Sequence, residues 1–125
     1  MKKSKINLVL SPLPKTWLID IDGTLLKHNG YLLDGADTLL DGVKEFFNTL
    51  PKEDKVILLT ARKEADLFIL GKFLKEKGIY FHQIIGDLPT GERILINDIK
   101  PSGLKTAYAI NKKRDKALEI AVHID

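Results

Sequence analysis

Short apolar runs divide the chain and predict its strands. Four of them are nearly continuous and end abruptly in polar residues: 17–19, 56–59, 83–85 and 94–96. This pattern is typical of strands buried on both faces of a parallel sheet. Two more apolar runs, residues 6–10 and 120–124, predict further strands. Pro12 and Pro14 leave the connection after the first of these two runs open, because proline interrupts regular strands.

Amphipathic stretches between the runs predict helices. One helical stripe contains five apolar residues: Leu39, Leu40, Val43, Phe46 and Phe47. A second stripe runs from Leu67 to Leu74 and is followed by Gly78, a residue type that commonly ends a helix. A third helix is predicted over residues 104–113. The alternation of strands and helices predicts an α/β fold, Rossmann-like, with three layers and a mostly parallel sheet.

Residues 25–33 depart from this alternation. Two short apolar arms flank Asn29 and Gly30, and Asn-Gly is a strong signal for a tight hairpin turn. We therefore expect a short hairpin flap after the strand that ends near Asp20. The 125 residues suit one domain, expected to span 1–125, with 1–15 as an extra N-terminal strand and its connection.

Composition excludes several classes of protein. With 44% hydrophobic and 30% charged residues the chain is expected to fold, and its 0 Cys exclude disulfides and cysteine nucleophiles. A net charge of +3 is too small to indicate a duplex-binding surface. The apolar run after the basic N-terminus is shorter than the ~7–15 residues of a secretory signal, and no run approaches the ~18–20 residues of a membrane span. We expect a soluble, cytoplasmic protein.

Residues 20–24, Asp-Ile-Asp-Gly-Thr, are the most informative segment because two carboxylates follow an apolar strand directly. Asp20 and Asp22 are poor residues to bury unless they are paired or bound to a cation. The simpler alternative is a strand closed by an Asp-Gly turn with solvated acids. Thr60 and Asp98 also follow apolar runs, and the carboxyl ends of parallel strands form the usual ligand crevice of such sheets.

With these motifs the chain resembles the haloacid dehalogenase superfamily, whose phosphatases carry Asp-x-Asp-Gly-Thr after the first strand. Thr60 matches the second motif and Asp98 the fourth, and the resemblance covers residues 16–101. It implies that Asp20 attacks phosphorus and that Asp22 serves as acid and then as base. A carboxylate nucleophile divides hydrolysis into two displacements, and one group cannot perform both roles at once.

The resemblance also implies Mg²⁺, held by the Asp20 carboxylate, the Asp22 backbone carbonyl and the Asp98 carboxylate. A phosphate beside carboxylates needs a counter-charge, and oxygen ligands favour Mg²⁺. The alternative for Asp98 is a helix cap, since a proline and a serine follow it closely.

Four further residues are candidates for contact with the phosphate. The Thr60 hydroxyl is expected to hydrogen-bond the transferring group, and Thr24 to orient the surroundings of the nucleophile. Arg62 and Lys63 start the following helix, where anions are favoured, although a solvated helix start explains them equally well.

The third motif departs from the family, which places a Lys between the second and fourth motifs. Residues 86–89 follow the third strand and contain none. Lys100 is the favoured substitute because it lies two residues after Asp98, with Lys63 and Arg93 as the alternatives. Arg93 precedes the predicted strand at 94–96 and is expected at its far end.

The remaining basic residues carry weaker signals. The three histidines, His28, His82 and His123, lack metal-ligand spacing, although His28 on the flap is within reach of a substrate in the predicted arrangement. Residues 112–114, Lys-Lys-Arg, are interpreted as a solvated helix end, where cations are favoured.

The intervals from Asp22 to Thr60 and from Thr60 to Asp98 are filled by one helix plus a strand or hairpin, which leaves no room for a cap domain. We therefore predict a capless, Mg²⁺-dependent phosphomonoester hydrolase that acts on a small phosphorylated metabolite, with a sugar phosphate as the first hypothesis by analogy. Neither a nucleic-acid nor a membrane partner is expected, and a homo-oligomer is compatible with the prediction. The alternatives are a nucleotide or nucleic-acid-end phosphatase and a non-catalytic phosphate-binding module.

Overall fold

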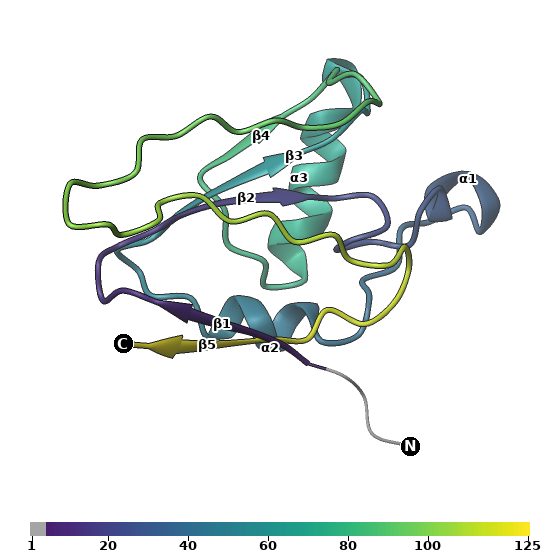
Figure 1. Cartoon of the computed structure of the whole chain (residues 1–125). Coiled ribbons are helices and arrows are strands. Elements are labelled where there is room, and N and C mark those ends of the chain that lie inside the picture. The colour runs from purple at the N-terminus through teal and green to yellow at the C-terminus, as the bar shows by residue number, and fades with distance from the viewer. Residues whose placement is uncertain (1–4) are drawn as a thin grey trace.

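Five strands form two small parallel sheets in the computed structural model, which describes residues 5–125 (Figure 1). In the first sheet β1 (Ile6–Leu10) pairs with β5 (Ile120–Ile124), and in the second the strand order is β2-β3-β4. The second sheet consists of β2 (Thr16–Asp20), β3 (Lys55–Leu59) and β4 (Gln83–Ile85). Every pairing between these strands is parallel. The predicted α/β class and five of the six predicted strands are confirmed.

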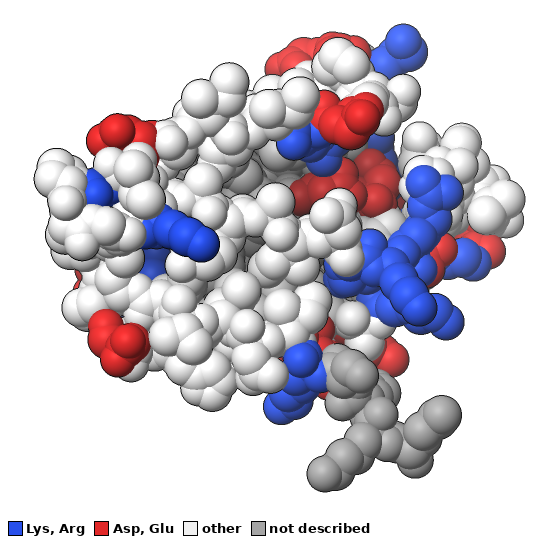
Figure 2. Space-filling view, viewed as in Figure 1, with Lys and Arg blue, Asp and Glu red and all other residues white. Residues whose placement is uncertain are grey.

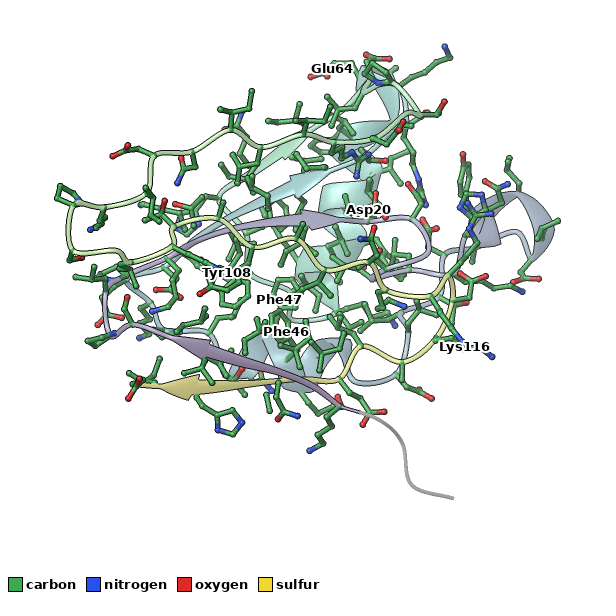
Figure 3. All side chains as sticks on the ribbon, viewed as in Figure 1. Asp20, Phe46, Phe47, Glu64, Tyr108 and Lys116 are labelled. Atoms are coloured by element: carbon green, nitrogen blue, oxygen red, sulfur yellow. The ribbon has the colours of Figure 1, made fainter. Side chains whose placement is uncertain are left out.

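The buried core contains side chains from β2 and β3, from the loop after β2 and from two helices, together with Ile79 and Leu118. Phe46 and Phe47 project from α2 (Val43–Asn48) and are largely buried, and Phe46 meets the Trp17 ring of β2 edge to face at 5.5 Å (Figure 3). Gly42 precedes α2 with a φ of 82°, and a Cβ there would lie 2.2 Å from the Leu118 carbonyl oxygen. A side chain at that position is therefore excluded twice, by backbone conformation and by space.

The helix α3 (Leu67–Glu76) follows a short 3₁₀ turn, η1 (Glu64–Asp66), and buries Leu70 and Leu74. Gly78, with a φ of 80°, ends it in a Schellman motif: the Gly78 N–H donates to the Lys75 carbonyl, and the Ile79 N–H to that of Leu74. The predicted helix end at Gly78 is confirmed. By contrast α2 is shorter than its predicted stripe, because the chain before Gly42 is not helical.

The predicted hairpin flap does not form. Residues 30–33 are a one-turn helix, α1 (Gly30–Leu33), and the flanking chain is closed by an isolated antiparallel bridge between Leu26 and Leu39. A type I′ hairpin turn needs positive φ at both central residues, whereas Asn29 has a φ of 56° and Gly30 lies outside that region. The segment between Leu26 and Leu39 is therefore a loop with one helical turn and not a β-hairpin.

Two predicted elements of the C-terminal half are absent. Residues 94–96 form no strand, and residues 104–113 form no helix. A strand needs hydrogen bonds from a neighbour, and β2 and β4, at the edges of their sheet, form no ladder with residues 94–96. A helix is stabilised mainly by a packed apolar face, and Tyr108 and Ile110 remain exposed.

Among residues 5–125, no helix has both the length and the apolar character that crossing a membrane requires.

Candidate functional site

The carboxyl ends of β2, β3 and β4 bring the first two sequence motifs together. Asp20 ends β2 in register with Leu59, and the Ile21 N–H donates to the Leu59 carbonyl at 3.0 Å. Thr60 follows β3 directly, and its N–H donates to the carbonyl of Ile85 at the end of β4. Parallel pairing therefore sets the Asp-x-Asp segment beside Thr60 at one edge of the sheet.

Buried apolar side chains anchor the loop after β2 in the core. Ile21, Leu25 and Leu26 are fully buried, and the Leu25 and Leu26 N–H groups both donate to the Ile21 carbonyl. Gly23, with a φ of 84°, makes the turn between them. The apolar residues of the loop point into the core, whereas the carboxylate side chains that alternate with them keep some exposure, 36% at Asp20 and 17% at Asp22.

Asp20 is held by two side chains, and its own side chain is 36% exposed. The Thr24 hydroxyl donates to Oδ2 at 3.0 Å, which is the geometry expected of a residue that orients a nucleophile. Arg93 Nη1 donates to Oδ1 at 2.7 Å. The sequence predicted Arg93 at the far end of a strand, and the absence of that strand is what lets it reach Asp20 here.

Asp22 is held more tightly, by Arg62 and Thr60. Arg62 Nε and Nη2 donate to Asp22 Oδ1 at 3.0 and 2.7 Å, and the Thr60 hydroxyl donates to Oδ2 at 2.8 Å. Thr60 is fully buried, and its hydroxyl oxygen also accepts the Arg62 N–H. The Thr60 hydroxyl therefore supports Asp22 directly.

Arg62 links this site to the loop that contains α1. Its Nη1 and Nη2 donate to the two Asp37 carboxylate oxygens at 3.0 and 2.7 Å, and its guanidinium lies 4.0 Å from the centre of the Tyr31 ring. Burial lowers the pKa of Arg62, but the hydrogen bonds that Arg62 donates to Asp37 and Asp22 raise the pKa by more, so the net shift is upward. With its side chain only 7% exposed, Arg62 positions two carboxylates.

Lys63, the other cation predicted at this helix start, is exposed directly before η1. Asp98 and Lys100 lie in a closed turn over residues 97–106. The Thr106 hydroxyl donates to the Asp98 carbonyl, and the Lys100 N–H donates to the Leu104 carbonyl at 3.1 Å. The chain around residue 100 turns at the left of Figure 1, whereas β2 ends at the right, beside the labelled Asp20 of Figure 3. The structure does not bring Asp98 or Lys100 to Asp20.

The structure therefore brings together only two of the three predicted Mg²⁺ ligands. Asp20 and Asp22 carry the oxygen donors that Mg²⁺ prefers. The third ligand, Asp98, lies elsewhere, and the described residues contain no group of three or more His, Asp or Glu side chains that could hold a metal ion.

Sequence reasoning missed two contributors to this region. Asp37 was a lone acid with no motif, so nothing in the sequence indicated that it pairs with Arg62. Residues 112–116 lie on the Asp20 loop, because the Asp115 N–H donates to the Gly23 carbonyl at 2.9 Å. Their run of cations was visible in the sequence, but their place in the fold was not.

Comparison with protein-family models, with curated proteins and with solved structures finds no match to this chain.

The Arg62 contacts predict a stability difference between two acids of the same loop. Asp37→Asn removes a charge that pairs with a nearly buried guanidinium, so it should lower the free energy of unfolding by about 1–2 kcal/mol. The matched control is Asp34→Asn, because Asp34 pairs with Lys27 and both side chains are at least 40% exposed. We expect this control to change stability by less than the error of a urea titration. Equal losses in the two variants would contradict the role of Asp37.

Proposed function

We propose that the chain is a phosphomonoester hydrolase in which Asp20 attacks phosphorus to form an aspartyl phosphate. The observation that carries this proposal is the pair of carboxylates at and just after the end of β2, each held by a threonine hydroxyl, with that of Asp20 36% exposed. Thr24 fixes one Asp20 oxygen, which leaves a partly exposed carboxylate with a defined direction of attack. Attack from this group converts one difficult displacement into two easier ones.

Asp22 is the proposed proton donor and acceptor. Its Oδ2 faces the Thr60 hydroxyl, a group that can donate or accept, so a proton on Oδ2 would still have a partner. Its Oδ1 is fixed by Arg62, which limits rotation of the carboxyl group. A carboxyl group positioned in this way contributes about 10²–10⁴-fold by general acid and base catalysis.

The finer fold and the Mg²⁺ site belong to the same proposal. The edge of β2 opposite β3 pairs with no other strand among the described ones, while Ile94, Leu95 and Ile96 are 82%, 53% and 90% exposed. We propose that in the active chain residues 94–96 join this edge in parallel, which extends the sheet to a Rossmann-like one. Asp98 would then follow the carboxyl end of a strand parallel to β2, and would lie beside the carboxyl end of β2. Mg²⁺ would supply positive charge for the phosphoryl group when bound by Asp20, Asp22 and Asp98.

Because Arg93 and Mg²⁺ would both bind the Asp20 carboxylate, we expect them to compete, and we expect removal of the Arg93 side chain to favour Mg²⁺ binding. Arg93→Ala removes the 2.7 Å ion pair to Oδ1, so we expect it to lower the Mg²⁺ concentration for half-maximal activity severalfold without lowering kcat/KM at saturating Mg²⁺. Lys100→Ala should instead lower kcat/KM by more than about tenfold, because Lys100 is the proposed phosphate-facing cation. The reverse ranking at saturating Mg²⁺ would assign that role to Arg93.

Hydrolysis of p-nitrophenyl phosphate by the purified chain with Mg²⁺ tests the proposed function. The substrate class we propose is small phosphorylated metabolites, with sugar phosphates first. A non-catalytic phosphate-binding module is the second candidate, favoured by the fact that all four Asp20 and Asp22 carboxylate oxygens already accept hydrogen bonds within the chain. Phosphate binding without turnover would select that candidate.

A further inference from the structure

The basic residues 112–116, Lys-Lys-Arg-Asp-Lys, are fixed on the loop that carries the two carboxylates. The Asp115 N–H donates to the Gly23 carbonyl at 2.9 Å, and Asp115 Oδ1 accepts the His28 N–H at 2.7 Å. Asp115 has a φ of 61°, a left-handed conformation that Asp adopts more readily than most residues. These bonds attach the segment to both ends of the loop between Gly23 and His28.

Downstream of the segment the chain enters the core, so the cations are not on a loose tail. Leu118 is 4% exposed, and its N–H donates to the Asp41 carbonyl at 2.8 Å. Upstream of Asp115, the Arg114 side chain covers the Gly23 backbone, since a Cβ built on Gly23 would lie 3.2 Å from Arg114 Cγ. Arg114 therefore lies directly beside the Asp-x-Asp turn.

Lys112 is the second cation that reaches this region. Burial lowers its pKa, and the negative charges of Asp115 and Asp20 oppose that shift. Its ammonium group donates to the Lys113 and Lys116 carbonyls at 2.8 and 2.6 Å, which closes a turn that presents Lys113 and Arg114 to solvent.

The segment has a surplus of positive charge. It contains four cations and one acid, and the acid, Asp115, already accepts a hydrogen bond from the backbone. Neither Lys113 nor Arg114 forms an ion pair with any residue between 5 and 125. Figure 2 shows Lys and Arg side chains gathered at the right of this face, beside recessed acidic atoms. Exposed cations that have no ion-pair partner among the described residues attract anions.

We propose that residues 112–116 bind a second anionic group of the substrate, so that the site prefers small phosphomonoesters carrying another phosphate or a carboxylate. This inference rests on the proposed function for the first phosphate, which would lie at Asp20. The cations on the Gly23 side of Asp20 are then in place for a group a few bonds away from that phosphate. An ordinary monophosphate would leave them unused.

Binding measured without turnover tests this inference separately from catalysis. The Asp20→Asn variant provides the background, because it lacks the proposed nucleophile, and calorimetry compares glucose 1,6-bisphosphate with glucose 6-phosphate. A second pair, 3-phosphoglycerate with glycerol 3-phosphate, tests a carboxylate as the second anion. We expect the ligand with two anionic groups to bind about tenfold more tightly in at least one pair, and the preference to weaken with salt.

The preference should depend on the segment. Lys113→Ala with Arg114→Ala should abolish it and leave affinity for the monophosphate within twofold. The matched control is Lys52→Ala with Lys72→Ala, two exposed cations elsewhere, which changes net charge equally and should retain the preference. Equal affinities within both pairs, or a preference that survives the Lys113 and Arg114 changes, would overturn the inference. Absence of p-nitrophenyl phosphate turnover would overturn the proposed function and leave this binding result valid.

Discussion

Asp20→Asn should abolish hydrolysis of p-nitrophenyl phosphate while the chain stays folded. The substitution keeps the volume of the side chain but replaces the attacking oxygen with an amide, which cannot form an aspartyl phosphate. Thr24 can still donate to the remaining carbonyl oxygen, so the loop after β2 keeps one of its side-chain contacts. We expect turnover to fall by at least about 10³-fold, with a circular dichroism spectrum and melting temperature close to those of the wild type.

Beryllium fluoride provides an independent measurement, because it forms a stable mimic of a phosphorylated carboxylate. With Mg²⁺ present, ¹⁹F NMR should show a bound signal in the wild type and none in Asp20→Asn. Asp87→Asn is a suitable control, since Asp87 is an exposed acid just after β4 whose carboxylate accepts the Glu64 N–H and meets no side chain of the site among residues 5–125. Wild-type turnover in Asp20→Asn would end the aspartyl-phosphate mechanism for this chain.

The strands and the first two motifs could be predicted because their evidence is local. An apolar run that stops at Asp20 or before Thr60 marks a buried strand end, and parallel pairing then brings such ends together whatever the intervening chain does. Gly78 is similar, because a helix end depends on one residue that tolerates positive φ.

The contacts that complete the site were not predictable, because each joins distant segments through side chains. Asp37 meets Arg62 only after the loop around α1 folds back, and a lone acid in a loop carries no sign of its partner. Asn-Gly predicted a hairpin because it fits a type I′ turn, but packing of that loop left Gly30 without the positive φ such a turn needs. At these positions tertiary contacts determine the backbone conformation more strongly than local sequence propensity does.

The region from residue 91 to residue 116 is where local pattern and structure differ most. Its apolar residues were expected inside a strand and a helix, and instead Ile94 and Ile96 are among the most exposed large side chains of residues 5–125. Burying a side chain of this kind is worth about 1.5–3 kcal/mol, so the three apolar residues of this run favour a rearrangement that covers them. The partner we propose for them is the edge of β2 that pairs with no strand among residues 5–125.

This rearrangement predicts that activity depends on Mg²⁺ and on Asp98. EDTA should eliminate turnover, added Mg²⁺ should restore it, and Asp98→Ala should raise the Mg²⁺ concentration for half-maximal activity by more than about tenfold, since it removes one of two proposed carboxylate ligands. The matched control is Glu92→Ala, an exposed acid of the same segment, which should leave the Mg²⁺ titration unchanged. The measurement is initial rate against free Mg²⁺ at fixed ionic strength, so that screening does not contribute to the difference. An unchanged titration in Asp98→Ala would show that Asp98 remains in the turn over residues 97–106 during catalysis, and that Asp20 and Asp22 bind the cation without it.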